Sequence, residues 1–186
     1  MNDEALPEAD RAAGAPHPRE TSQLFGQETA EKAFLAAVNS GHLHHAWLLT
    51  GPQGIGKATL AWRMARFLLA KAPEDAGLFG DAPAPPANLD ISPDLPVAAR
   101  IAALSEPGCM LIRRAWDADR KRLKAQITVD EVRQLNAFFG LSSTDGGHRV
   151  VIVDSVDEMN PSAANAILKV LEEPPKNAVL ILISHQ

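Results

Sequence analysis

The nine residues GPQGIGKAT, at positions 51–59, restrict the fold of this chain more than any other stretch. They nearly match the phosphate-loop pattern G-x-x-x-x-G-K-[S/T], with Gly51, Gly56 and Lys57 in place. A short apolar run, AWLLT, leads directly into them, and apolar residues at helical spacing follow. A strand, a glycine-rich turn and a helix N-terminus surround an anion with backbone N–H groups. The stretch therefore predicts a phosphate-binding turn between a buried strand and a helix.

The rest of the chain alternates between strand-like and helix-like apolar patterns. Continuous apolar runs are typical of strands buried on both faces, and the segments between them carry one apolar face at helical spacing. This alternation predicts an α/β fold, in which helices cover both faces of a parallel sheet. Strands are expected over 46–50, 109–113, 150–153 and 178–184. Helices are expected over 27–40, 57–71, 97–105, 127–140 and 162–173.

Two of these helices carry clear start signals. Thr128 and Glu131 have the spacing of a capping box, in which each residue's side chain bonds the other's backbone N–H. Asn160 followed by Pro161 is a good N-cap with proline at the first helical position. We therefore expect these two helix N-termini to be sharply defined.

Two stretches do not fit the alternating pattern. Residues 1–21 are acidic and rich in proline and alanine, so they offer little to bury and predict a disordered tail. Residues 72–96 are rich in proline and predict a long surface insertion. The length suits one domain plus tails, and this domain is expected to cover 22–186.

Bulk composition excludes several classes of protein. The net charge of -5 argues against a general nucleic-acid coat protein, so any DNA contact needs a local basic patch or partner subunits. The single cysteine, Cys109, excludes an internal disulfide and a multi-cysteine zinc site. The N-terminus lacks the apolar core of a signal peptide, and no apolar run approaches the ~20 residues of a membrane span. We expect a soluble, cytoplasmic protein without a membrane partner.

The residue after Lys57 departs from the phosphate-loop pattern. Ala58 stands where a serine or threonine hydroxyl normally joins the magnesium shell. Thr59 does not simply substitute, because one step along a helix rotates the side chain by about 100 degrees. Magnesium is therefore expected to be held poorly, while the backbone cradle and Lys57 remain.

The apolar strand Val150–Val153 ends on Asp154, in the Walker B arrangement, where the aspartate holds the metal through its water shell. The alternative is a carboxylate that merely caps the following turn. Hydrolytic members of this class place a glutamate next, to polarise the attacking water. Ser155 occupies that position and is a poor base at neutral pH. Ala58 and Ser155 are thus two degenerate positions, and we expect no catalytic residue in this chain.

The quoted motifs, together with HLHHAWLLTGPQGIGKATLA, VVIVDSVDEMN and NAILKVLEEPP, resemble the clamp-loader branch of AAA+ proteins, which have a P-loop NTPase fold. Within it they resemble the DNA polymerase III gamma/tau and delta prime subunits. The imperfect phosphate loop and the serine after Asp154 favour the delta prime type. The resemblance covers residues 22–186 and implies a nucleotide-binding set in which the loop glycines and lysine contact phosphate, Asp154 faces the metal and Ser184 takes the sensor 1 position. The set is Gly51, Gly54, Ile55, Gly56, Lys57, Ala58, Thr59, Asp154 and Ser184.

The resemblance implies further features. Leu24–Gln27 would lie near the adenine, and NAILKVLEEPP would form a subunit interface and DNA-facing helix. Many relatives insert a four-cysteine zinc module after the phosphate-loop helix, but here residues 72–96 contain no cysteine, so no zinc is expected. The Ser-Arg-Cys motif that carries the arginine finger, the lid helices and the collar domain would lie beyond Gln186. We expect this chain to be an N-terminal piece without them.

Two functions follow from the resemblance. The first is a non-hydrolysing stator of the delta prime type, which binds ATP weakly or not at all. Its partners would be gamma/tau and delta in a hetero-oligomer, with the sliding clamp and primed DNA contacted through the complex. The second is an active clamp-loader ATPase of the gamma/tau type. A small-molecule kinase with a phosphate loop is a more distant alternative, because NAILKVLEEPP has no role there.

Three weaker features each have a structural explanation. The basic segment 113–124 could touch DNA phosphates, but we favour a solvated hairpin. The group His42, His44 and His45 lacks the carboxylate or cysteine company that a metal site needs. Lys169, Glu172 and Glu173 are interpreted as the polar face of an interface helix rather than an acid–base cluster.

Overall fold

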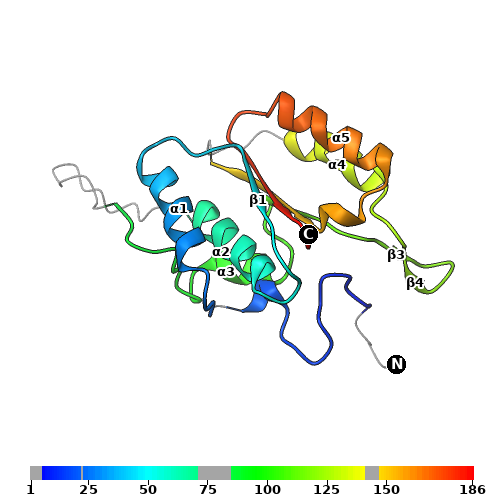
Figure 1. The fold of residues 1–186 in the computed structure, drawn as a ribbon, viewed down its shortest axis with the longest axis horizontal. Coiled ribbons are helices and arrows are strands. Elements are labelled where there is room, and N and C mark those ends of the chain that lie inside the picture. The colour runs from blue at the N-terminus through cyan, green and yellow to red at the C-terminus, as the bar shows by residue number, and fades with distance from the viewer. Residues whose placement is uncertain (1–5, 22, 71–84, 141–146) are drawn as a thin grey trace.

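The computed structural model describes residues 6–21, 23–70, 85–140 and 147–186. Within these ranges a four-stranded sheet forms the centre of the molecule, in the order β1-β6-β5-β2 (Figure 1). All neighbouring pairs are parallel, as the alternation of strands and helices predicted. The strands are β1 (Ala46–Leu49), β2 (Cys109–Ile112), β5 (Arg149–Asp154) and β6 (Ala178–Ile183).

The two central strands, β5 and β6, are the most apolar because helices cover them on both faces. Every residue of β6 is buried, and only Arg149 at the start of β5 is partly exposed. Successive side chains of a strand point to opposite faces, so each strand contributes to two separate cores. Val150 and Ile152 pack into one core, whereas Val151 and Val153 pack into the other.

Helices cover both faces of this sheet (Figure 1). On one face lie α1 (Glu28–Asn39), α2 (Lys57–Leu69) and α3 (Pro96–Ala102), packed on Val179 and Ile181. On the other face lie α4 (Val129–Gly140) and α5 (Pro161–Glu172), packed on Leu180 and Leu182. The predicted α/β architecture is therefore confirmed. In the described ranges no helix is long and apolar enough to cross a membrane.

Both predicted helix start signals are present. The Glu131 carboxylate accepts a hydrogen bond from the Thr128 backbone N–H at 2.7 Å and another from the Thr128 hydroxyl. The Asn160 side chain accepts from the Ala163 backbone N–H at 2.8 Å. These bonds satisfy backbone groups that the first turn of a helix would otherwise leave unpaired.

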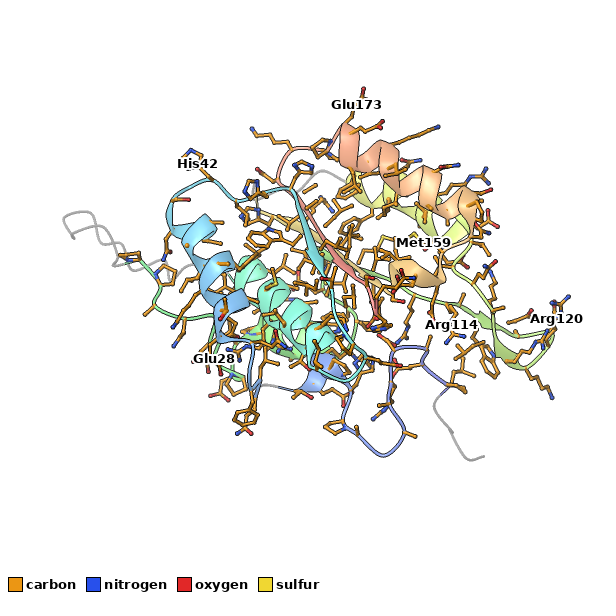
Figure 2. All side chains as sticks on the ribbon, viewed as in Figure 1. Glu28, His42, Arg114, Arg120, Met159 and Glu173 are labelled. Carbon is orange, nitrogen blue, oxygen red and sulfur yellow. The ribbon has the colours of Figure 1, made fainter. Side chains whose placement is uncertain are left out.

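The basic segment 113–124 forms the predicted hairpin, with strands β3 (Trp116–Asp117) and β4 (Arg122–Leu123). Figure 2 shows Arg120 at its tip, directed into solvent. The basic residues at its base are already engaged: Arg113 with Glu8, Arg114 with Glu158 and Lys124 with Glu131. Much of the segment's positive charge is therefore neutralised within the chain.

The expectation of a disordered tail over residues 1–21 is wrong for residues 6–21. This part of the chain lies against the domain and ends in a short helix, η1 (Pro18–Glu20). The His17 side chain is completely buried, and Arg19 donates to the Ala102 carbonyl oxygen at 2.9 Å. Ion pairs and hydrogen bonds hold the segment, whereas the prediction considered only how little apolar surface it could bury. Residues 1–5 lie outside the described residues.

The predicted surface insertion, 72–96, falls partly outside the described residues, which resume at 85. The part that is described does not lie wholly on the surface, because Leu89 is buried in the core beside α2. Asp90 pairs with Arg63 at 2.9 Å. The buried Leu89 and the Asp90–Arg63 pair therefore both attach this segment to the domain in spite of its prolines.

Candidate functional site

The loop between β1 and α2 has the backbone shape of a phosphate cradle. Gly51, Gly54 and Gly56 all have positive φ, between +87° and +133°, a region that residues with a Cβ rarely adopt. A Cβ on Gly56 would lie 2.7 Å from Leu24 Cδ1, so the loop also needs glycine for space. The sequence therefore specifies this turn through its glycines.

Lys57 begins helix α2 and directs its side chain back into the loop. Its ammonium donates hydrogen bonds to the carbonyl oxygens of Gly51 at 2.7 Å and Pro52 at 2.6 Å. Burial lowers the pKa of Lys57, while the carboxylates of Asp154 and Asp157 act in the opposite direction. The ammonium is thus held at the centre of the turn, where a phosphate could replace the carbonyls as its partner.

Asp154 ends β5 on the same side of the sheet, and its side chain is nearly buried. Burial raises the pKa of Asp154 to about 7, and the negative charges of Asp10 and Glu158 raise it further, while His17 and Lys57 oppose the rise. A carboxyl group with this pKa is protonated in a large fraction of molecules at neutral pH. A cation that binds here would therefore have to displace this proton.

Ser155 follows Asp154 and is 2% exposed. Its hydroxyl oxygen has no hydrogen-bond partner among the described residues. The acidic residues that come next are engaged elsewhere. Asp157 accepts from Ser184 Oγ at 2.9 Å, and Glu158 accepts from Arg114 Nε at 2.8 Å. Each of these two carboxylates therefore already has a donor partner in the described site, and Glu158 also lines the cavity described next.

A cavity of about 420 Å³ joins the loop to the end of β5. Gly54, Gly56, Lys57, Ala58 and Thr59 line it from the loop side, and Asp154 and Ser155 line it from the sheet. The structure therefore brings most of the predicted site residues together. Gly51 and Ser184 do not line the cavity. The Ser184 hydroxyl instead donates a hydrogen bond to Asp157, which was not among the predicted site residues.

The remaining predicted residue, Ile55, lies on the other side of the loop. A second, open hollow there is lined by Ile55, Thr59 and residues 23–27. Gln27 donates from its side-chain amide to the Ile55 carbonyl oxygen at 2.8 Å, and the Phe25 side chain is 81% exposed beside it. This is the segment expected near an adenine, and it does lie against the loop.

Residues of the N-terminal segment also line the cavity, and the sequence did not predict this. Ala9, Asp10, Arg11 and Pro18 line it opposite the loop. No local motif signals this placement, because the segment reaches the site through long-range ion pairs.

The histidine group lies at the other end of β1, outside the cavity. His42 Nδ1 lies 2.8 Å from the Ser40 carbonyl oxygen and His45 Nε2 lies 3.1 Å from the Leu171 carbonyl oxygen. Among the residues that the structure describes, no three side chains of the metal-binding types are grouped to hold an ion. Lys169, Glu172 and Glu173 are exposed on α5, remote from Lys57 in the fold.

Residues 26–186 match the model of the family described as DNA polymerase III, delta subunit. A DNA polymerase III subunit delta' from Pseudomonas aeruginosa is 37% identical over 142 residues, which cover 76% of this chain and 38% of that protein. A DNA polymerase III subunit gamma from Buchnera aphidicola is 27% identical, with 89% and 39% covered. The chain thus spans about two-fifths of the length of these relatives.

The fold is also similar to that of a solved structure. A solved structure of a DNA polymerase III gamma subunit-related protein from Thermotoga maritima superposes with a TM-score of 0.52 and 18% identity, covering 81% of this chain and 39% of that one. At this identity the likeness concerns the fold alone. It agrees with a parallel sheet covered on both faces, with the loop after its first strand.

Proposed function

The chain belongs to the DNA polymerase III, delta subunit family, and from that premise we propose that it acts as a delta prime-type, non-hydrolysing stator in the complex that loads the sliding clamp onto primed DNA. Replication of the chromosome would place it in the cytoplasm. Its partners would be the gamma/tau and delta subunits of a hetero-oligomer. The chain would contact the sliding clamp and the DNA through that complex.

One observation carries the non-hydrolysing part of this proposal. The position that should hold a water-activating carboxylate holds Ser155, whose hydroxyl is buried and is a poor base at neutral pH. Asp157 is fixed by Ser184, and Glu158 is fixed by Arg114. A general base must take a proton from the attacking water, and the serine at this position does so poorly at neutral pH.

The loop nevertheless suits a phosphate group. Its glycines expose backbone N–H groups at the start of α2, and Lys57 supplies a positive charge. Magnesium fits less well, because Ala58 offers no hydroxyl and the pKa of Asp154 is raised to about 7. When bound, magnesium would supply charge neutralisation at the phosphates. We propose that adenine nucleotide binds weakly here, with little dependence on magnesium, and that no zinc is held.

Helix α5 supports the proposed assembly. Ala163 and Ile167 are buried against the sheet, whereas Leu168 on the same helix is 51% exposed. Lys169 and Glu173 lie nearby on a hollow between α4 and α5. A single exposed leucine is common on protein surfaces, so the assignment of this face to a partner subunit rests chiefly on the resemblance of NAILKVLEEPP to the clamp-loader subunits. We propose α5 as part of the interface with neighbouring subunits.

A gamma/tau-type ATPase is the second candidate, favoured by the similarity to gamma subunits. A steady-state ATPase assay on the full-length protein, alone and in the reconstituted complex, separates the two candidates. The stator proposal expects the same turnover for the wild-type complex and for a complex with Lys57→Ala in this subunit. Lys176→Ala, which removes an exposed lysine outside the site, is the matched control. Turnover that disappears only with Lys57→Ala would refute the proposal.

A further inference from the structure

The segment from Glu8 to Pro18, which we call the strap, forms part of the wall of the cavity that Lys57 and Asp154 also line. In Figure 1 this blue segment passes near the C-terminal end of β6, where the parallel strands of the sheet finish. Ligands of open α/β sheets bind at that edge. The strap and the loop thus line the same cavity. Its cavity-lining residues are Ala9, Asp10, Arg11, Ala12, Ala15, Pro16 and Pro18.

Arg113, just after β2, holds one end of the strap. Its guanidinium donates to Glu8 Oε1 at 3.0 Å and also binds the Asp10 carboxylate. Arg19 donates to the same Glu8 oxygen at 2.8 Å. The Asp10 side chain is completely buried in this arrangement. Charge-assisted hydrogen bonds between arginine and carboxylate are among the stronger polar contacts, so this end is firmly attached.

Helix α2 holds the other end. Arg66 donates to the carbonyl oxygens of Arg19 at 2.8 Å and Thr21 at 2.9 Å. The buried ring of His17 packs edge-on against Trp62, with 6.5 Å between ring centroids. His17 Nδ1 accepts from the Arg19 backbone N–H at 3.1 Å, and its Nε2 lies 3.2 Å from Asp10 Oδ2. The His17 ring therefore connects this fixed end to Asp10.

The strap changes what the cavity can accept. It encloses the phosphate side of the loop, while the hollow lined by residues 23–27 on the other side is not lined by the strap. It also places the Asp10 carboxylate near Asp154, which raises the pKa of Asp154. A nucleotide's phosphates would meet both the strap backbone and this added negative charge. The adenine base, by contrast, would enter the hollow lined by residues 23–27, which the strap does not line.

We propose that the strap is an intrachain gate, which must release Arg113 and move aside before a phosphate-bearing ligand reaches Lys57. The proposal rests on the phosphate-binding role of the loop, and it does not require the clamp-loader role. Because only the open form binds such a ligand, the apparent affinity equals the affinity of the open form multiplied by the fraction of molecules that are open. The arginine–carboxylate pairs therefore set the nucleotide affinity from outside the loop.

The experiment neutralises the strap carboxylates in the full-length protein with the double substitution Glu8→Gln and Asp10→Asn. Asp94→Asn with Asp130→Asn is the matched control, since both side chains are exposed and neither lines the cavity. Amide hydrogen exchange of residues 8–18 reports release of the strap. The rate at which an amine-reactive reagent labels Lys57, read by peptide mass spectrometry, reports access to the loop without any nucleotide.

We expect Lys57 labelling about tenfold faster, and a fluorescent ATP analogue bound about tenfold more tightly, in the strap variant only. Arg113→Gln, which leaves the strap carboxylates intact, should shift both readouts in the same direction. Unchanged labelling in a variant whose strap exchanges freely would overturn the gate. Faster labelling without any gain in ATP binding would support the gate and count against nucleotide binding at the loop.

Discussion

The hydroxyl of Ser184 donates a hydrogen bond to Asp157 Oδ1 at 2.9 Å, which joins the end of β6 to the short helix η2 (Val156–Glu158) after β5. The backbone N–H of His185 donates to the other oxygen of the same carboxylate at 2.5 Å. Because β5 and β6 are adjacent parallel strands, their carboxyl ends meet at one edge of the sheet. The Asp157 side chain thus fixes the two strand ends that border the cavity.

The first prediction concerns this pair. Ser184→Ala should lower the free energy of unfolding by about 1 kcal/mol, a typical net value for one hydrogen bond, and Asp157→Ala by about 2 kcal/mol, because its carboxylate also accepts from the His185 backbone N–H. The double variant should lose less than the sum, because the two residues share a contact. Chemical denaturation of the four proteins in a double-mutant cycle measures the coupling. Strictly additive losses would show that the bond does not stabilise the fold.

The second prediction concerns the pH dependence of stability. The pKa of Asp154 is raised from 3.8 to about 7 in the folded chain, mainly by burial. Between these values the folded state holds a proton that the unfolded state has lost, so stability falls as pH rises through this window. Asp154→Asn should therefore equal the wild type near pH 4 and exceed it above pH 7, by roughly 4 kcal/mol at most.

Urea unfolding at pH 4, 6 and 8 tests this, with the exposed Asp94→Asn as control. The control should follow the wild type at every pH. A stability difference between Asp154→Asn and the wild type that shrinks with rising pH would contradict a raised pKa.

The third prediction concerns Ser155, whose buried hydroxyl oxygen lacks a partner among the described residues. Ser155→Ala should leave stability unchanged or raise it by up to about 1 kcal/mol, because no hydrogen bond is lost. Ser155→Glu should lower it by several kcal/mol, since it introduces an unpaired charge at a buried position. Thermal unfolding measures both. Full stability of Ser155→Glu would mean that the site has room for a catalytic glutamate.

That result also bears on restoring activity. Ala58→Ser together with Ser155→Glu supplies both missing groups, yet we expect little ATP turnover from this double variant. Ser155 is 2% exposed, so the new carboxylate needs space that the fold does not provide. Turnover comparable with an active clamp-loader ATPase would show that these two positions alone account for the missing chemistry.

The fourth prediction concerns the start of α5. Asn160→Ala removes the side-chain oxygen that accepts from the Ala163 backbone N–H, and it should cost about 1 kcal/mol. Asn165→Ala is the matched control, because Asn165 is exposed within the same helix and alanine favours helix there. The shift in melting temperature should therefore be negative for Asn160→Ala alone. Equal shifts for the two variants would exclude a capping role.

Local patterns were sufficient for the sheet, the helices and the loop. The apolar runs of β5 and β6, the Thr128–Glu131 box and the glycines of the loop each act over a few residues, so their outcome can be read in order along the chain. The hairpin at 113–124 followed in the same way. The place of Asp154 after Val153 predicted the end of a buried strand correctly, but the expectation that this strand lies next to the loop strand is wrong, because β6 lies between β5 and β1.

Long-range polar contacts lay beyond such patterns. Glu8 and Asp10 stand in a segment with little to bury, and the sequence predicted disorder because it showed nothing of Arg113, more than a hundred positions away. The hydrogen bonds of Asp157 with Ser184 and of Glu158 with Arg114 could not be predicted for the same reason. Leu89 was missed as a core residue because its neighbours are prolines and polar residues.

The sequence by itself determined a phosphate-loop turn, a parallel α/β sheet and the absence of a hydroxyl at 58 and a carboxylate at 155. These are properties of residue type and short spacing. Only the tertiary structure decided that burial raises the pKa of Asp154, that Ser184 donates a hydrogen bond to Asp157 and that the strap lines the same cavity as the loop. Burial, charge pairing and cavity shape depend on which distant residues the fold brings together, and local sequence patterns do not show which residues these are.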